Sequence, residues 1–260
     1  MPVLDARDVD FLIATAREAG TTILQVYKQD FIVTSKSDSS PLTEADLRAH
    51  QVIVTRLRQR YPEIPILSEE STETAAYKER KKWARCWLVD PLDGTKEFIK
   101  RNGQFTVNIA LIVDSHPHTG VVYAPALDLL YWGQAGHGSF KKEASGQVIE
   151  LTKPTPVSRD KLIVTGSLSH ATPEMEAFLA AQSAQYKEIE FVPMGSSLKL
   201  CMVADGSADM YPRLGPTMEW DTAAAHAVVN AAGRQVLRYG STEELRYNKP
   251  DLRNDWFLVR

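Results

Sequence analysis

The chain has 260 residues, of which 43% are hydrophobic and 24% charged, and its formal net charge at pH 7 is -3. This length and apolar content suffice for a full hydrophobic core, in one large domain or in two lobes that share a cleft. The slightly acidic balance excludes the broad basic surface that binds nucleic acid. No apolar run approaches the ~18 residues of a transmembrane segment, and the first residues lack the apolar stretch that would predict a signal peptide.

Two cysteines, Cys86 and Cys201, lie far apart in the sequence and form neither a CxxC pair nor a zinc-binding spacing. We therefore expect two free, buried thiols in a reducing compartment, and hence a cytoplasmic protein. Peripheral contact with the inner face of the membrane stays open as an alternative. The sequence does not determine the oligomeric state.

The first part of the chain is predicted to be mainly helical. Apolar residues recur at three- and four-residue steps over residues 8–29, which is typical of an amphipathic helix. A polar connection over residues 35–41 follows it. A second helix is expected from Thr43 to about Arg60, where Pro62 ends it.

The middle of the chain is predicted to be rich in strands. Apolar segments predict a short buried strand at residues 64–67 and a strand at residues 83–89, and turn signals separate three strands of an antiparallel sheet at residues 106–113, 120–124 and 129–132. Residues 71–82 are polar, and we expect them to be mobile or helical at the surface. The loop 153–159, which has two prolines, is a candidate hinge between an N-terminal lobe (1–155) and a C-terminal lobe (156–260), with the functional site between the lobes.

The rest of the chain alternates between strands and helices. We expect strands at residues 162–165, 190–192, 208–211, 236–238 and 256–259, and helices at residues 173–182, 196–204 and 221–232. Pro173 opens the first of these helices, and Gly233 ends the last. The pattern indicates a mixed α/β chain of the α+β type rather than a simple parallel βαβ series.

The most informative segment is 87–95, where an apolar strand ends in two carboxylates, Asp90 and Asp93, followed by a glycine and a hydroxyl. Two such charges ~4 Å apart repel by about 4 kcal/mol at an effective dielectric constant of about 20. A divalent cation removes this repulsion, and oxygen ligands suit a hard ion such as Mg²⁺. Asp-Gly is also a common turn signal and Asp a common N-cap, so the segment alone supports a metal site and a plain turn about equally.

Other acids have competing structural and functional interpretations. Glu69 and Glu70 follow a short strand, where they either ligate the same ion or remain solvated. Asp46 fits the third helical position of a capping box that starts at Thr43. Asp221 precedes a run of alanines that lets its helix pack closely, and N-capping is the structural alternative for this acid.

Two residues after the acids supply groups that a phosphate needs. Backbone N–H groups after Gly94, at the start of a helix, form an anion cradle, and the Thr95 hydroxyl can hold a water molecule. Lys199 and Arg213 are scattered cations, and each alone is more typical of a surface than of a site. His170 follows a strand in a serine-rich segment and is the better pocket candidate among the histidines.

Together these segments resemble the inositol-monophosphatase-like superfamily of metal-dependent, lithium-sensitive phosphatases. The resemblance covers essentially the whole chain, and its motifs at residues 40–46, 68–70, 90–95 and 220–221 match in order and spacing. It implies a layered α-β-α-β-α sandwich with mixed and antiparallel sheets. Further stretches at residues 87–103, 195–199 and 211–213 look like the bacterial 3′(2′),5′-bisphosphate nucleotidase branch of this superfamily.

This resemblance implies a phosphatase that removes the 3′-phosphate of adenosine 3′,5′-bisphosphate, a by-product of sulfate assimilation, to give AMP and phosphate. It implies two or three Mg²⁺ ions held by the following ligands: Glu69, Asp90, Asp93, Asp221 and the Leu92 carbonyl. Three residues would orient and deprotonate the attacking water: Asp46, Glu70 and Thr95. The substrate would be held through the metal ligands and by the following groups: the backbone at Gly94 and Thr95, with His170, Ser196, Lys199 and Arg213 around the nucleotide.

One segment departs from the pattern of the branch. Ser167-Leu168-Ser169-His170 stands where the branch usually has Ser-Arg-Ser-His, so Leu168 replaces an arginine that could contact phosphate or adenine. The substrate is therefore more open than the reaction. The alternatives are an inositol monophosphatase or another sugar-phosphate phosphatase of the superfamily and, in a different class, a catalytically weak nucleotide- or metal-binding regulator.

Overall fold

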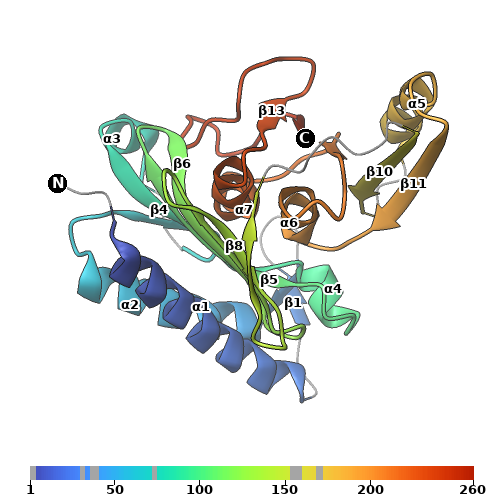
Figure 1. Ribbon diagram of the computed structural model, residues 1–260. Coiled ribbons are helices and arrows are strands. Elements are labelled where there is room, and N and C mark those ends of the chain that lie inside the picture. The colour runs from blue at the N-terminus through green and yellow to red at the C-terminus, as the bar shows by residue number, and fades with distance from the viewer. Residues whose placement is uncertain (1–3, 30–32, 36–40, 72–74, 153–159, 168–171) are drawn as a thin grey trace.

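The computed structural model describes residues 4–29, 33–35, 41–71, 75–152, 160–167 and 172–260. These residues form alternating layers of helix, sheet, helix, sheet and helix (Figure 1). The layering and the mixed sheets confirm the predicted fold class. The candidate hinge at residues 153–159 lies outside the described residues, so the division into two lobes stays a prediction.

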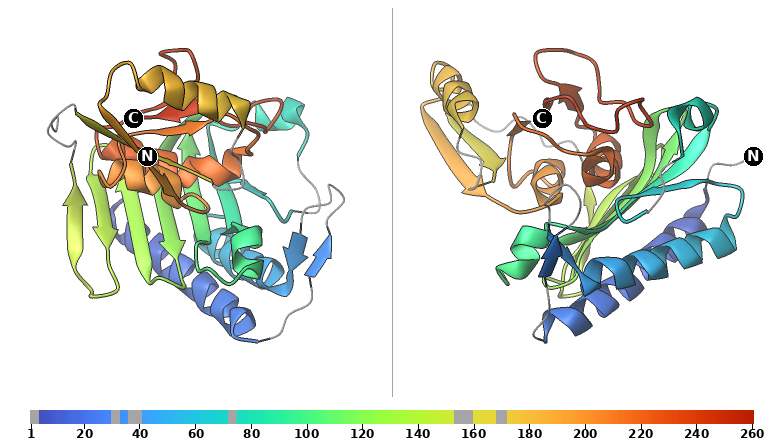
Figure 2. Two further views of the ribbon diagram at one scale, coloured as in Figure 1. Left: turned by 90° about the vertical axis from the view of Figure 1, so that its right-hand side faces the viewer. Right: turned by 180° about the vertical axis from the view of Figure 1, so that it is seen from behind.

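The largest element is a sheet of seven strands between two pairs of helices. Its order is β3 (Ile66–Ser68), β4 (Arg85–Asp93), β5 (Thr106–Val113), β6 (His116–Ala124), β7 (Leu129–Gln134), β8 (Gly138–Lys142) and β9 (Val148–Leu151). Strands β3 and β4 are parallel, and the other pairs are antiparallel. Figure 2 shows α1 (Ala6–Tyr27) and α2 (Glu44–Arg60) on the face opposite α6 (Leu198–Ala204) and α7 (Glu219–Ala231).

The second layer of strands lies beyond α6 and α7. It contains β12 (Tyr211–Arg213), β14 (Phe257–Val259) and β13 (Val236–Arg238), together with the parallel pair β10 (Lys161–Gly166) and β11 (Glu188–Pro193). Helix α5 (Pro173–Gln182) packs on β10, because Phe178 lies in one apolar cluster with Leu162 and Val164. The remaining elements are short: β1 (Val33–Ser35), β2 (Pro41–Thr43), α3 (Tyr77–Arg80) and α4 (Thr95–Ile99).

Both faces of the large sheet are buried, and each has its own core. Along β4, Trp87 and Val89 pack toward α1 and α2, whereas Cys86 and Leu88 pack toward α6 and α7. This alternation explains why the strand reads as a continuous apolar run in the sequence. Both cysteines are free and buried, as expected. Among the described residues, every helix is too short or too polar to span a lipid bilayer.

Most predicted elements are confirmed, and the exceptions have physical reasons. The capping box at the start of α2 is present, because the Asp46 carboxylate accepts hydrogen bonds from the Thr43 backbone N–H and hydroxyl at 2.9 and 2.6 Å. Strands β8 and β9 were not predicted, since β8 is largely polar and β9 has only four residues. Strand β6 begins at His116, not at residue 120, because the turn needs just Asp114 and Ser115 at φ of 48° and 65°.

Helix α7 lies almost in contact with the backbone of the sheet. A Cβ atom built on Gly120 of β6 would meet the Ala224 carbonyl oxygen at 2.1 Å, and one on Gly133 of β7 would meet the Cα atom of Val228 at 2.7 Å. The small side chains of α7, including Ala224, allow the same close approach from the helix side. The depth at which α7 sits on the sheet is thereby fixed, and with it the position of its first turn.

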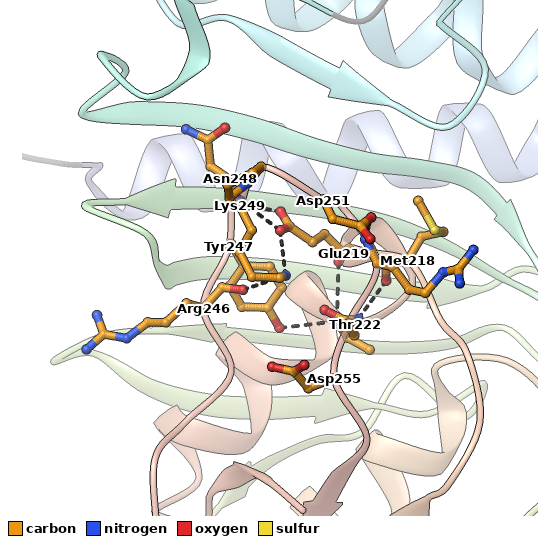
Figure 3. Close-up of polar contacts among 12 residues, drawn as sticks. Met218, Glu219, Thr222, Arg246, Tyr247, Asn248, Lys249, Asp251 and Asp255 are labelled. Carbon is orange, nitrogen blue, oxygen red and sulfur yellow. Dashed lines mark hydrogen bonds and ion pairs between the residues drawn. The ribbon is translucent and has the colours of Figure 1, made fainter. Parts of the chain in front are cut away.

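The first turn of α7 is also held from the C-terminal segment (Figure 3). The fully buried Glu219 carboxylate accepts hydrogen bonds from the backbone N–H groups of Asn248 and Lys249, at 2.5 and 3.0 Å, and from the Lys249 ammonium at 2.6 Å. The Asn248 side chain in turn accepts a hydrogen bond from Arg80 Nη1 of α3 and donates one to the Arg80 carbonyl, both at 2.8 Å. Arg80 is 3% exposed, so the polar segment 71–82 is not wholly at the surface, in contrast to the prediction.

We expect Lys249→Met to lower the free energy of unfolding by about 3 kcal/mol, because it leaves the buried Glu219 carboxylate without its ionic partner. Urea denaturation measures the change. The double variant Glu219→Gln with Lys249→Met should recover a large part of the loss, because no charge then stays buried. A single-variant loss no larger than that of an exposed control such as Lys187→Met would contradict this account of the ion pair.

Candidate active site

A one-residue irregularity in β4 places two acids on one face of the sheet. Asp90 lies opposite Asn108 of β5, but Asp93 lies opposite Thr106, so three steps on β4 match two steps on β5. In a regular strand, residues three apart point to opposite faces, and one extra residue corrects this. Leu92 accordingly packs in the core on the α1 and α2 side. Asp90 and Asp93 both face α6 and α7.

Three carboxylates from different elements meet beside this bulge. Glu69 directly follows β3, which runs parallel to β4, so the two strands end at the same edge of the sheet. Glu69, Asp90 and Asp221 each offer a ligand oxygen, and these oxygens lie within 4.8 Å of one another. Carboxylate oxygens at such a spacing can hold a hard divalent cation. Asp93 joins the group through its own contacts at the start of α6.

Asp221 occupies a different helical position from the one predicted. Helix α7 begins at Glu219, so Asp221 is its third residue and not its N-cap. Its carboxylate accepts a hydrogen bond from the Met218 backbone N–H at 2.9 Å. The side chain is thus fixed by its own helix while it faces Glu69 and Asp90, so the structural and functional interpretations of this acid are compatible.

The clustered acids repel one another, and the pKa values of three of them are raised. Burial raises the pKa of Asp90 well above its ordinary value, and the charges of Glu69, Asp93 and Asp221 raise it further. Burial also raises the pKa of Asp221 well above its usual range, with Asp93 as the next cause. The pKa of Asp93 is raised by burial against the opposing charge of Lys199 and its hydrogen bonds from Ser197. A bound cation would counteract these shifts, because its positive charge favours the ionised form of each carboxyl group.

A second group of predicted residues gathers at Thr95. The Thr95 hydroxyl lies 3.5 Å from Asp46 Oδ1 and 3.4 Å from the Leu92 carbonyl oxygen, both at the long limit of a hydrogen bond. Asp46 is 1% exposed, and its other oxygen is held by Thr43. Glu70 is half-buried and follows Glu69 at the end of β3. Thr95, Asp46 and the Leu92 carbonyl therefore lie together.

A pocket adjoins the acids, and six of the predicted site residues line it: Asp93, Gly94, Ser196, Lys199, Arg213 and Asp221. Gly94 has a left-handed backbone with φ of 92°, and a Cβ there would lie 3.1 Å from the Gln104 carbonyl oxygen and 3.3 Å from the Ser196 Cβ. The glycine is thus needed for both conformation and space. It lets the turn at the start of α4 approach the loop before α6.

Two cations of this pocket have hydrogen-bond donors without a protein acceptor in the described part of the chain. Lys199 is 7% exposed and donates to the Ser196 carbonyl at 2.6 Å, and burial lowers its pKa to about 8 against the opposing charge of Asp93. Arg213 donates from Nη2 to the Pro216 carbonyl at 2.8 Å, while its buried Nε has no hydrogen-bond partner among the described residues. An anionic ligand would satisfy both side chains.

Some predicted residues are not placed, and some pocket residues were missed. His170 and Leu168 lie outside the described residues, so their roles stay predictions. Lys96 and Glu97 also line the pocket, and their position directly after Gly94 and Thr95 was a signal for this. Tyr211, Thr217, Thr222 and Phe257 line it as well, but ordinary strand and helix residues of this kind give no sequence signal.

Comparisons with known proteins agree with this geometry. The sequence model described as the inositol monophosphatase family matches residues 5–255. The chain is 48% identical over 232 residues to the 3′(2′),5′-bisphosphate nucleotidase CysQ of Escherichia coli (strain K12), which covers 88% of this chain and 89% of that protein. It is 37% identical over 262 residues to the CysQ nucleotidase of Haemophilus influenzae, covering 100% of this chain and 94% of that protein.

Solved structures show the same fold. The crystal structure of CysQ from Bacteroides thetaiotaomicron, a bacterial member of the inositol monophosphatase family, has a TM-score of 0.85 at 43% identity and covers 98% of this chain and 97% of that chain. The extragenic suppressor protein suhB from Bartonella henselae has a TM-score of 0.74 at 24% identity and covers 90% and 88%. At that lower identity, the likeness concerns the fold alone.

The raised pKa values of Asp90, Asp93 and Asp221 predict how the stability of the metal-free protein depends on pH. A group whose folded-state pKa lies above its unfolded value binds more protons when folded, so its stabilising effect is full below the ordinary value of about 4 and is lost as pH rises through the raised value. In the presence of a chelator, the melting temperature should therefore fall as pH rises above about 4 and through the raised pKa values, more steeply in the wild type than in Asp90→Asn. Equal slopes would contradict these shifts.

Proposed function

Because the chain belongs to the inositol monophosphatase family, we propose that it is a magnesium-dependent phosphatase that removes the 3′-phosphate of adenosine 3′,5′-bisphosphate. The observation that carries the choice of substrate is the pair of cations in the pocket beside the acids, the buried Lys199 and the half-buried Arg213. They supply a site for a second phosphate, whereas the acids serve the phosphate that is removed. The curated nucleotidases to which the chain is similar support the same choice.

The donor set fits magnesium. Buried carboxylates that raise one another's pKa need a cation, and the oxygens of Glu69, Asp90 and Asp221 are close enough to share one. We assign Asp93 and the Leu92 carbonyl as the further ligands of a site for two or three ions. When bound, the ions would stabilise charge on the phosphoryl oxygens and lower the pKa of a water molecule.

Thr95, Asp46 and Glu70 would prepare the attacking water. Thr43 holds Asp46 Oδ2, and Asp46 Oδ1 lies 3.5 Å from the Thr95 hydroxyl, so Asp46 would orient that hydroxyl, which in turn would position the water. We assign the proton of that water to these acids, with Glu70 beside the metal ligand Glu69 as the acceptor that is half exposed to solvent. Because the water would attack the phosphate directly, the proposed reaction forms no covalent intermediate with the protein. Neither cysteine lies in the proposed site.

The remaining groups would hold the substrate. Backbone N–H groups at Gly94 and Thr95, at the start of α4, would bind the phosphate that is removed. The ammonium of Lys199 has three donors, of which the Ser196 carbonyl takes one, so it can bind a second phosphate. Ser196 and Arg213 complete this subsite, and His170 is proposed as its neighbour from outside the described residues.

We expect Asp90→Asn to reduce kcat by about 100-fold or more, because a neutral amide replaces a charged metal ligand of the same shape. The metal-free variant should at the same time melt at a higher temperature than the metal-free wild type, since one repelling charge is gone. Phosphate release and thermal melting measure the two effects. Asp10→Asn, an exposed acid of α1, is the control, and near-wild-type turnover of Asp90→Asn at saturating Mg²⁺ would contradict the ligand assignment.

A phosphate-release panel with Mg²⁺ tests the substrate. We expect Lys199→Met to lower kcat/KM for adenosine 3′,5′-bisphosphate by about 30-fold, because a charge-assisted hydrogen bond to the second phosphate is lost. On inositol 1-phosphate, which lacks that phosphate, the loss should stay within about threefold. Equal losses on both substrates would assign Lys199 to the reaction centre. A wild type that prefers inositol 1-phosphate would instead indicate an inositol monophosphatase.

A further inference from the structure

One serine hydroxyl connects the two halves of the acid cluster. Ser197, which is 1% exposed, precedes α6, and its Oγ lies 2.6 Å from the Asp221 carbonyl oxygen and 2.8 Å from Asp93 Oδ2. Its backbone N–H also donates to Asp93 Oδ2, at 2.6 Å. Asp93 belongs to β4 and Asp221 to α7, so a single residue touches both elements.

The single hydroxyl proton of Ser197 can be donated to just one of these two acceptors. A hydroxyl donates one hydrogen bond, and here it faces two acceptors. Because the backbone N–H already serves Asp93, the hydroxyl proton is free to serve the nearer acceptor, the Asp221 carbonyl. Ser197 thus holds Asp93 with its backbone and Asp221 with its side chain.

Asn108 fixes the direction of that hydroxyl. Its Nδ2 donates to Ser197 Oγ at 2.8 Å, and Asn108 is 1% exposed. The opposite amide orientation would give the hydroxyl a third acceptor for its single proton, so the donating orientation is the consistent one. Asn108 lies directly opposite Asp90 in the β4–β5 ladder, and paired residues share a face of the sheet.

We propose that Ser197 and Asn108 are positioning residues that set the spacing between Asp93 and Asp221 and thereby the affinity of the site for Mg²⁺. The inference rests on the proposed function, since it takes these two acids as metal ligands. Asp221 is held at both ends: its carboxylate by the Met218 N–H and its carbonyl by Ser197. Without the Ser197 hydroxyl, the first turn of α7 loses its hydrogen bond to the residue that also holds Asp93 of β4.

The decisive variant is Ser197→Ala. It keeps the backbone N–H contact to Asp93, removes the hydroxyl that lies beside the Asp221 carbonyl and Asp93 Oδ2, and leaves the Asn108 amide without its acceptor. We expect the Mg²⁺ concentration for half-maximal activity, and for half of the Mg²⁺-induced rise in melting temperature, to increase on the order of tenfold. At saturating Mg²⁺, kcat should return to within about threefold of the wild type, and KM should be unchanged.

A matched control separates this role from a general loss of stability. Ser139→Ala removes another fully buried hydroxyl, on β8, where it donates to the Trp132 carbonyl at 3.5 Å. This variant should lower the melting temperature of the metal-free protein without changing the Mg²⁺ requirement. A purely structural role of Ser197 would give the same result for Ser197→Ala.

Asn108→Ala supplies a second, independent measurement. It leaves the Ser197 hydroxyl in place but free to rotate, so we expect a smaller increase in the Mg²⁺ requirement, of about threefold. Because Asn108 acts through Ser197, the double variant should need no more Mg²⁺ than Ser197→Ala alone. If Ser197→Ala does not fold, Asn108→Ala decides the matter by itself.

An unchanged Mg²⁺ requirement in the folded variants would overturn the inference, and so would additive effects in the double variant. These results are distinguishable from a failure of the proposed function. In that case the wild type itself would show neither Mg²⁺-dependent phosphate release nor a Mg²⁺-dependent melting temperature, whichever residue stands at position 197.

Discussion

The site depends on one extra residue in a strand. Without the bulge between Asp90 and Asp93, the second acid would point into the apolar core beside α1 and α2, where Leu92 now packs. Pro91 suits this place, because it has no N–H group to contribute to the ladder. The bulge therefore brings two negative charges to the same face at the point where they repel each other most, which is the condition that a bound cation relieves.

The rest of the structure holds the partners of these acids at fixed distances. Glu69 is placed by the parallel pairing of β3 with β4, and Asp221 by the seat of α7 on the sheet. Three sets of contacts fix the position of α7 on the sheet: the glycines beneath the helix, the hydrogen bonds of Glu219 with the C-terminal segment, and the hydrogen bond from Ser197. A stable protein that confines four acids needs such independent supports, since each support offsets part of the repulsion.

Much of the fold and of the candidate site could be predicted from the sequence, and physical reasons explain why the remainder could not. Local signals gave the capping box at Thr43, the strand that ends in Asp90, and the close packing of the alanine-rich helix, because each depends on a few neighbouring residues. The proposed metal ligands came from the resemblance to the family, which rests on the order and spacing of several motifs. What failed was non-local or short: strands β8 and β9, the buried Arg80, and the helix start that makes Asp221 the third residue and not the cap. The contacts of Ser197 and Asn108 join segments far apart in the chain, and no periodicity reveals them.

The glycines under α7 have an implication for how such a protein changes over evolutionary time. Gly120 and Gly133 lie in the sheet and do not line the pocket, yet even one added methyl group at either position would lift the helix that carries Asp221. Mutational tolerance at these two positions should thus track the needs of the chemistry and not those of the local strands. A larger side chain at either position would change activity by displacing Asp221 through its helix, and not by changing the residues that line the pocket.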